Sequence, residues 1–349
     1  MSDIFNPGGP HDIKRIGQDR FSMCISIPND PDGMFARECP SDACSPAYFK
    51  VKSGTGITKG QTEAFCPYCR YSDQPSNFAT KGQIEYATQI ATHEALDGVD
   101  GMIKDALGLD GSGERTLGGG FLSLKISYTP GSKVPIWRPF EEVLRRDLKC
   151  PKCTLEHAVF GIATWCPDCG SDIFLTNVLM EYNVIRLILS DVENRRERLG
   201  VRVAARDVEN ALEDAVSIFE AVLRAITRRH LRNTLSVDQT EEILKKRIGN
   251  KFQNITLASE IVQQHFSTSL LSILPCNEGE ELKEIFEKRH PIAHNLGIVD
   301  RKYLEKIDSG ELEGRDIRVS AEEVSRAIEL CLKVFNDFYL KVFPSAIPL

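Results

Sequence analysis

Apolar residues repeat with a helical period through the second half of the chain. Between residues 206 and 232 they recur at alternating spacings of four and three, and a second stripe follows residue 320. Such stripes are typical of helices that bury one face in a bundle. The first stripe contains Val208, Leu212, Ala215, Phe219, Val222 and Ile226, and the second contains Val324, Ile328, Cys331, Phe335, Phe338 and Val342.

The pattern predicts further helices over residues 177–198, 237–248, 254–268 and 278–289. The first of these stops at Gly200. The last helix of the chain begins at Ser320, where Glu323 completes a capping box, and it ends at Pro344. Together these elements predict an all-α antiparallel helical bundle over residues 176–349.

The first half of the chain is patterned differently. Apolar residues alternate with other residues over 21–27 and 122–128, which indicates strands, and a short strand is expected at 48–51. The predicted fold class is therefore α+β, with N-terminal β modules followed by the helical bundle. The predicted units are a first module over residues 1–79, a helix with a glycine-rich linker over 80–120, a second module over 121–175, and the bundle over 176–349.

Composition narrows the class of protein. The chain has 349 residues, of which 42% are hydrophobic and 27% are charged, and this balance describes a globular protein. No stretch approaches the roughly 20 apolar residues of a membrane span, and the N-terminus lacks the apolar core of a signal peptide. We therefore expect a cytoplasmic protein that does not bind membranes. The net charge of −7 requires any contact with nucleic acid to depend on local basic patches.

Eight of the eleven cysteines fall into two sets of paired cysteines. In a chain without an export signal, such pairs are better interpreted as metal ligands than as disulfides. Pairs carried on turns around short strands describe a zinc ribbon, and four thiolates leave no open position for a catalytic water, so we expect two structural zinc ions. The first set is Cys39, Cys44, Cys66 and Cys69, and the second is Cys150, Cys153, Cys166 and Cys169.

The role of these ribbons is less specified. Zinc ribbons commonly present a small β surface to nucleic acid or to a protein partner, and Lys50, Lys52, Lys59 and Arg70 surround the first set. The alternative is that the metal only stabilises domains whose cores are too small to fold alone.

Residues 287–295, with the sequence EKRHPIAHN, concentrate polar chemistry. They hold Arg289, His290 and His294, although the whole chain has only seven histidines. Pro291 is expected to interrupt the helix between the two histidines, so that Arg289 ends one helix and His294 lies one turn into the next. An arginine and a histidine placed across such a break can handle a phosphate. The alternative is a polar corner between two helices.

Basic residues also cluster late in the first striped stretch, residues 206–232, and just after it. Placed beside Arg289, they could steer an RNA backbone. The alternative is a solvated face balanced by nearby acids. The candidate RNA-binding residues are Arg224, Arg228, Arg229, Lys245 and Lys246.

The C-terminal region resembles the HEPN superfamily. The resemblance rests on Arg289-x4-His294, with the polar His290 directly after the arginine, on the following segment His294-Asn-Leu-Gly-Ile-Val-Asp-Arg-Lys-Tyr303, and on a helix before the motif and a long helix at the end. It covers roughly residues 200–345. Many members of that superfamily are metal-independent endoribonucleases of toxin, antiviral defence or RNA-processing systems.

The resemblance implies that Arg289 and His294 are catalytic and that His290 occupies the family's polar position. Histidine titrates near neutral pH and can move protons, and arginine can stabilise a charged phosphate. One histidine cannot conveniently act as both acid and base in an in-line reaction, so the resemblance also implies a homodimer that brings two motifs together. The alternative is a non-catalytic zinc-ribbon module that binds nucleic acid or protein, with a bundle that only dimerises.

Overall fold

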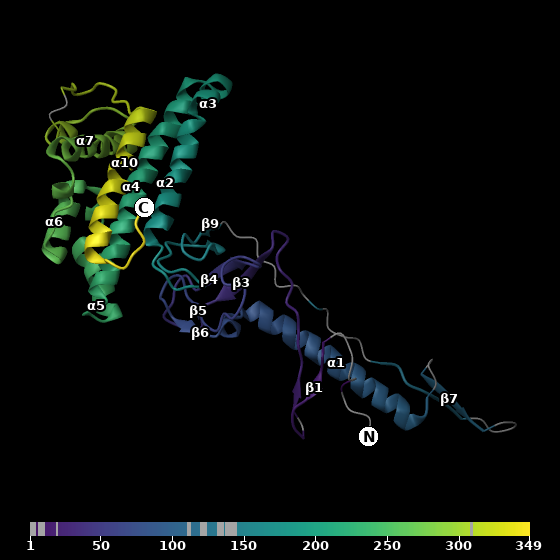
Figure 1. The fold of residues 1–349 in the computed structure, drawn as a ribbon. Helices are drawn as coiled ribbons and strands as arrows, with labels where there is room; N and C mark the ends of the chain where they lie inside the picture. Colours follow the sequence, from purple (N-terminus) through teal and green to yellow (C-terminus); the bar gives the residue numbers. More distant parts are fainter. Residues whose placement is uncertain are drawn as a thin grey trace.

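The computed structural model shows a mixed α+β chain with small antiparallel sheets first and helices after them (Figure 1). No helix in the described part is long and apolar enough to span a membrane. The residues described are 5, 11–18, 20–109, 113–118, 124–130, 136, 145–307 and 310–349.

A four-stranded antiparallel sheet joins the two cysteine-bearing segments. Its order is β3 (Met34–Glu38), β4 (Tyr48–Lys52), β10 (Glu156–Val159) and β9 (Arg146–Lys149). The central pairing of β4 with β10 connects residues that are about a hundred positions apart in the sequence. The strands of the two predicted modules therefore form one sheet. We call residues 34–78 and 145–173 the cysteine unit.

The cysteine unit has a small core. Phe49, Phe78, Leu155 and Ile173 are fully or almost fully buried there, together with four of the cysteines. A short hairpin of β5 (Ala64–Phe65) and β6 (Ser72–Asp73) carries the turn between Cys66 and Cys69. The apolar side chains thus pack around the sulfurs.

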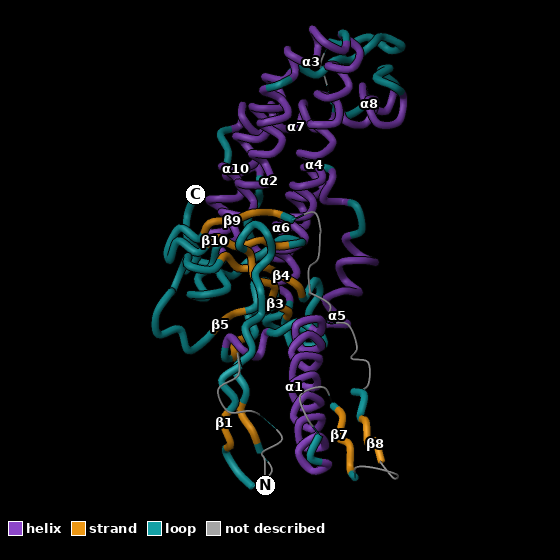
Figure 2. The backbone as a smooth tube through the Cα atoms, turned by 90° about the vertical axis from the view of Figure 1, so that its right-hand side faces the viewer, coloured by secondary structure: helices purple, strands orange, loops and turns teal. Residues whose placement is uncertain are grey.

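An arm extends from the cysteine unit away from the C-terminal helices (Figures 1 and 2). Its main element is α1 (Lys81–Leu107), which begins with a capping box between Thr80 and Gln83 and is anchored by a hydrogen bond from Gln83 to the carbonyl of Ala36 in β3. Two hairpins belong to the same end of the molecule, namely β1 (Lys14–Arg15) with β2 (Phe21–Ser22), and β7 (Glu114–Leu117) with β8 (Leu124–Ser127). The strand predicted over residues 21–27 is wrong beyond its first two residues, because no partner strand continues the pairing among the described residues.

The C-terminal helices, residues 174–349, form what we call the helical region. Its two stripes become the buried faces of α4 and α10, as their periodicity predicts. The capping box at Ser320 and Glu323 is also confirmed. The helices are α2 (Phe174–Ser190), α3 (Val192–Leu199), α4 (Val201–Leu231), α5 (Val237–Glu242), α6 (Ile255–Phe266), α7 (Cys276–Glu287), α8 (Arg289–Asn295), α9 (Arg301–Leu304) and α10 (Ala321–Val342).

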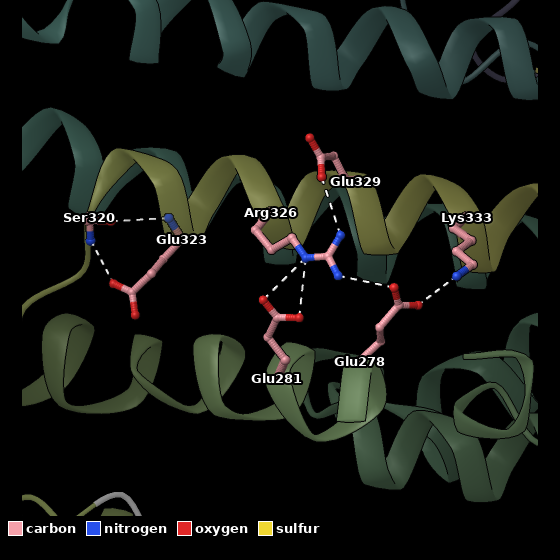
Figure 3. A network of polar contacts seen from close by, with 7 residues as sticks. All are labelled: Glu278, Glu281, Ser320, Glu323, Arg326, Glu329 and Lys333. Atoms are coloured by element: carbon pink, nitrogen blue, oxygen red, sulfur yellow. Dashed lines mark hydrogen bonds and ion pairs between the residues drawn. The ribbon is translucent and has the colours of Figure 1, made fainter. Parts of the chain in front are cut away.

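Two predicted helices are divided. The helix expected over residues 177–198 breaks at Asp191 into α2 and α3, and the one expected over 237–248 changes from α5 to a π-helical stretch at Ile243–Ile248. Arg326 of α10 contacts Glu278 and Glu281 of α7 and Glu329 of its own helix, and Lys333 also pairs with Glu278 (Figure 3). These contacts supplement the apolar packing of the two helices.

A buried polar junction ties the cysteine unit to the helical region. Asp172 accepts hydrogen bonds from the hydroxyl of Tyr339 in α10 and from Arg229 in α4, at 3.1 and 2.6 Å. The ring of Tyr339 stacks on Phe174 with centroids 4.5 Å apart. The two regions therefore meet through a charged contact that is itself covered by aromatic rings.

Candidate functional site

The eight paired cysteines gather into two groups of four, each group with its sulfur atoms within 4.8 Å of one another. Within the first group, Cys39 and Cys69 sulfurs lie 3.7 Å apart and those of Cys44 and Cys66 lie 3.5 Å apart. The corresponding pairs of the second group, Cys150 with Cys169 and Cys153 with Cys166, are separated by 3.8 and 3.5 Å.

These separations fit one tetrahedral ion per group. Four sulfurs at the Zn–S distance of about 2.3 Å would lie about 3.8 Å from one another in a regular tetrahedron. The predicted ligand sets are therefore brought together as two centres positioned for metal binding.

The turns that present the sulfurs share one backbone form. The residue after the second cysteine of each Cys-Pro-x-Cys turn has a positive φ, namely 65° at Arg70, 64° at Thr154 and 60° at Gly170. Its N–H donates to the carbonyl of the first cysteine in the turn. Glycine is needed at position 170 for a second reason, because a Cβ there would approach the Phe65 ring to 3.0 Å.

Protonation of the thiols is uneven within each group. Hydrogen bonds from the Cys44 and Cys66 thiols lower the pKa of Cys69, and a hydrogen bond from Cys166 lowers the pKa of Cys150. Each group thus has one sulfur that is readily deprotonated. Because a metal ligand must be a thiolate, binding of an ion would release the protons of the remaining thiols.

The second candidate site lies on α8 and differs from its prediction. The helix break falls at Lys288, between α7 and α8, and not at Pro291. Pro291 lies in the first turn of α8, where its missing N–H removes no intrahelical bond. Consequently Arg289, His290 and His294 all belong to one short helix, and the expected arrangement across a break is wrong.

His290 and His294 are brought together on one face of α8. Their ring centroids are 5.1 Å apart, as expected for residues four apart on a helix. Nε2 of His290 lies 3.8 Å from a carboxylate oxygen of Asp300, which in turn accepts a hydrogen bond from Asn295. Partial burial lowers the pKa of His290, with Asp300 partly opposing the shift. Asp300 was not a predicted site residue, and no motif in the sequence relates it to His290.

Arg289 points to a different part of the helical region. It lies five positions before His294, which corresponds to roughly 140° around the helix axis. Its Nη1 donates to the side chain of Gln253 at 3.3 Å, and its buried Nε has no partner among the described residues. Gln253 itself donates to Glu220 of α4 at 2.7 Å. Within one chain, the two histidines therefore face each other, and Arg289 points away from them.

Most of the predicted RNA-binding side chains are engaged in ion pairs. Arg224 pairs with Glu220, Arg228 with Glu241, Arg229 with Asp172, and Lys246 with Glu242. Lys245 is exposed on the π-helical stretch. Pairing with nearby acids agrees with the alternative interpretation, although Asp172, the partner of Arg229, is buried and not on a solvated face. The contribution of the cluster to RNA binding stays a prediction.

The lysines near the first cysteine set also have structural partners. Lys50 is buried and pairs with Asp30 at 2.5 Å, and Lys52 pairs with Glu156 at 2.6 Å. Arg70 differs, because its guanidinium lies over the Trp165 ring at 4.4 Å from the centroid. This contact connects the two cysteine-bearing segments, and their separation of about a hundred residues hides it from sequence reasoning.

Comparisons with family models, with curated proteins and with solved structures found no match to this chain.

Proposed function

We propose that the protein is a metal-independent endoribonuclease whose reacting groups lie on α8. The observation that carries the proposal is the paired imidazoles of His290 and His294, 5.1 Å apart, with Asp300 beside the first. The resemblance of this segment to the HEPN motif supports the same chemistry. A carboxylate next to a histidine orients the ring and stabilises its charged form when it takes up a proton.

In the proposed reaction, one neutral imidazole removes the proton from a ribose 2′-OH. The 2′ oxygen attacks the adjacent phosphorus, and the bond from phosphorus to the 5′ oxygen of the next nucleotide breaks. A protonated imidazole then gives a proton to that leaving oxygen. The products are a 2′,3′-cyclic phosphate and a 5′-hydroxyl end, and no oxidant or metal is consumed.

The lowered pKa of His290 suits it to the role of base, because more of its imidazole is neutral and able to accept a proton. His294 is exposed and can act as the acid. The arginine that clamps the phosphate would then come from a second copy of the chain, in a two-fold dimer that places its α8 beside the first.

We infer that zinc occupies both tetracysteine centres. Thiolate ligands and the tetrahedral spacing favour it over calcium or magnesium, which prefer oxygen ligands. Both centres supply four protein ligands, so their role is to hold the zinc ribbons of the cysteine unit for recognition of RNA or of a partner.

A second candidate function is that of a non-catalytic module that binds nucleic acid or protein and dimerises through the helical region. The engagement of Arg289 by Gln253 favours this alternative, because it removes the arginine from the histidine face within the chain.

The two functions are separated by a variant series in an RNA cleavage assay that contains EDTA, with bound zinc measured before and after. We expect His294→Ala and His290→Ala to lower the cleavage rate about 10²–10⁴-fold, the range for loss of a general acid or base. Arg289→Ala should lower it about 10²–10³-fold, as for loss of a group that stabilises transition-state charge.

Arg301→Ala is the matched control, since this α9 arginine is 82% exposed and, among the described residues, its one ion pair is with its helical neighbour Glu305. Its rate should stay within twofold of the wild type. If all four variants cut like the wild type, or if the wild type does not cut, the nuclease proposal is wrong and the binding module is favoured.

A further inference from the structure

An arginine-lined cleft lies where the cysteine unit meets the end of α4. Its volume is 740 Å³, within the range of about 300–1,000 Å³ that is typical of ligand sites. The cysteine unit contributes Arg70 and Trp165, and α4 with the residue after it contributes Arg228, Arg229 and Arg232. The cleft therefore combines residues from three distant parts of the sequence.

Positive charge is in excess in this cleft. Arg228 and Arg232 share one carboxylate, that of Glu241, at 2.7 and 3.2 Å. Arg229 is paired from behind by the buried Asp172. Arg70 is exposed and has no carboxylate within ion-pair distance among the described residues. Four arginines thus face two carboxylates, and the thiolates of Cys44 and Cys69, which also line the cleft, partly offset the excess of two positive charges.

Trp165 holds two of the arginines in a fixed orientation. The guanidinium carbons of Arg70 and Arg229 lie 4.4 and 4.5 Å from its ring centroids, and that of Arg229 also lies 3.8 Å from the centroid of Phe343. A guanidinium stacked through its flat face keeps its N–H edge available for phosphate oxygens. Trp165 is therefore a positioning residue for the cationic wall.

We propose that this cleft binds the phosphate backbone of a short single-stranded RNA segment. Proteins bind single strands with positively charged grooves in which aromatic rings or guanidinium planes support the bases. A cleft of this size does not accommodate a duplex, because a helix with two strands presents phosphates across a much wider front.

The position of the cleft suits the substrate of α8. Arg289 reaches Glu220 through Gln253, and Glu220 precedes Arg228 by eight residues of α4. Eight residues correspond to roughly 12 Å along a helix. A strand that leaves the cleft along α4 would therefore approach α8 on the side of Arg289. This part of the inference rests on the proposed ribonuclease function, whereas RNA binding by the cleft can be measured without it.

The test is a binding titration of the zinc-loaded full-length chain with a fluorescein-labelled single-stranded RNA and with a duplex of equal length. The double variant Arg70→Glu with Arg232→Glu should weaken single-strand binding at least tenfold. Arg202→Glu at the opposite end of α4, 69% exposed and paired with Glu209, is the matched control and should change it less than twofold. For Arg70→Ala with Arg232→Ala, the slope of log affinity against log salt should fall by about 1.4, which is two single-strand phosphate contacts.

The fluorescence of Trp165 tests whether the RNA binds in this cleft. The chain has two tryptophans, so Trp137→Phe leaves Trp165 as the sole one. RNA should change the Trp165 emission of this variant with the same midpoint as the titration. Trp165→Ala should weaken binding, and Trp165→Phe should restore part of it, because a smaller ring still supports the stacked guanidiniums.

The proposal is overturned if the charge-reversed double variant and the Arg202 variant bind RNA equally, if the duplex binds as tightly as the single strand, or if Trp165 emission does not respond. It is also overturned if Arg70→Ala only lowers the zinc content, since Arg70 would then merely offset the negative charge of the neighbouring thiolates. Binding in the cleft without cleavage would contradict the nuclease proposal alone. Cleavage that needs His294 but ignores the cleft variants would contradict this inference alone.

Discussion

The cysteine unit and the helical region reach an ordered structure by different means. In the cysteine unit, four of the ten buried core residues are cysteines, and the rest of the core consists of a few rings and aliphatic side chains. In the helical region, α2, α4, α7 and α10 bury one continuous apolar core. We therefore expect the stability of the cysteine unit to depend on the metal that its cysteines would bind, and that of the helical region to depend on side-chain packing.

The largest expected difference between the two regions is in their response to removal of zinc. Structural zinc contributes about 10–16 kcal/mol of binding free energy in zinc-finger peptides, which exceeds what so small a core supplies. A strong chelator should therefore unfold the cysteine unit while the helical circular dichroism of residues 174–349 persists. Elemental analysis should find two zinc ions per chain, and one in Cys150→Ser.

Cys276→Ser is the control for that experiment, because Cys276 is exposed and lies outside both groups. It should keep two ions. A metal content near zero in the wild type, or loss of helical signal in step with metal removal, would contradict the division into two regions.

The second prediction concerns the junction between the two regions. Asp172→Ala leaves Arg229 and Tyr339 without their shared carboxylate in a buried contact, and we expect a loss of about 3 kcal/mol, near the low end for such a deletion because Arg229 is 24% exposed. Urea unfolding of the zinc-loaded protein measures the loss. Asp337→Ala, at an exposed position of α10, should change stability by less than about 0.5 kcal/mol. Equal effects of the two variants would show that the junction does not couple the regions.

Acid should destabilise the cysteine unit through His157. This histidine is fully buried in β10, and burial lowers its pKa from 6.5 to about 4. The unfolded chain therefore binds one more proton between these values, so stability is complete above pH 6.5 and falls by about 3 kcal/mol as the pH drops to 4. His157→Gln should remove this part of the pH dependence. Zinc release at low pH affects both proteins, so the difference between their urea midpoints at pH 7.5 and 5 is the measurement. Parallel pH profiles would contradict the assignment.

The smallest expected effect lies on the surface of the helical region. Arg326 contacts three glutamates, and Glu281 and Glu278 raise its pKa, but its side chain is 37% exposed (Figure 3). Arg326→Ala should therefore change the midpoint of thermal unfolding only slightly. Arg318→Ala, at 88% exposure, should cost close to nothing. A loss of several kcal/mol at Arg326 would mean that this polar network, and not the apolar core, holds α7 to α10.

The same contrast explains which features the sequence could predict. The cysteine spacings identified both ligand groups, because each turn by itself directs two sulfurs to one point. The stripes on α4 and α10 identified their buried faces and the capping box at Ser320. These are local patterns, and local backbone geometry is enough to interpret them.

Contacts between residues far apart in the chain could not be predicted from the sequence. The pairing of β4 with β10 merges the two predicted modules, and the contact of Arg70 with Trp165 depends on that pairing. On α8, Pro291 lies in the first turn, where a proline is compatible with the helix. The helix break is therefore at Lys288 and not at Pro291, and His290 lies on the same helix as His294. The proposed dimer and the RNA target stay predictions.

End-group analysis of cleaved RNA decides whether α8 acts as proposed. Purified wild-type protein is incubated with a defined single-stranded RNA in EDTA, and the products are analysed by mass spectrometry beside those of His294→Ala. The proposal predicts 2′,3′-cyclic phosphate and 5′-hydroxyl ends from the wild type and neither from the variant. Products with 3′-hydroxyl and 5′-phosphate ends, or identical products from both proteins, would contradict it.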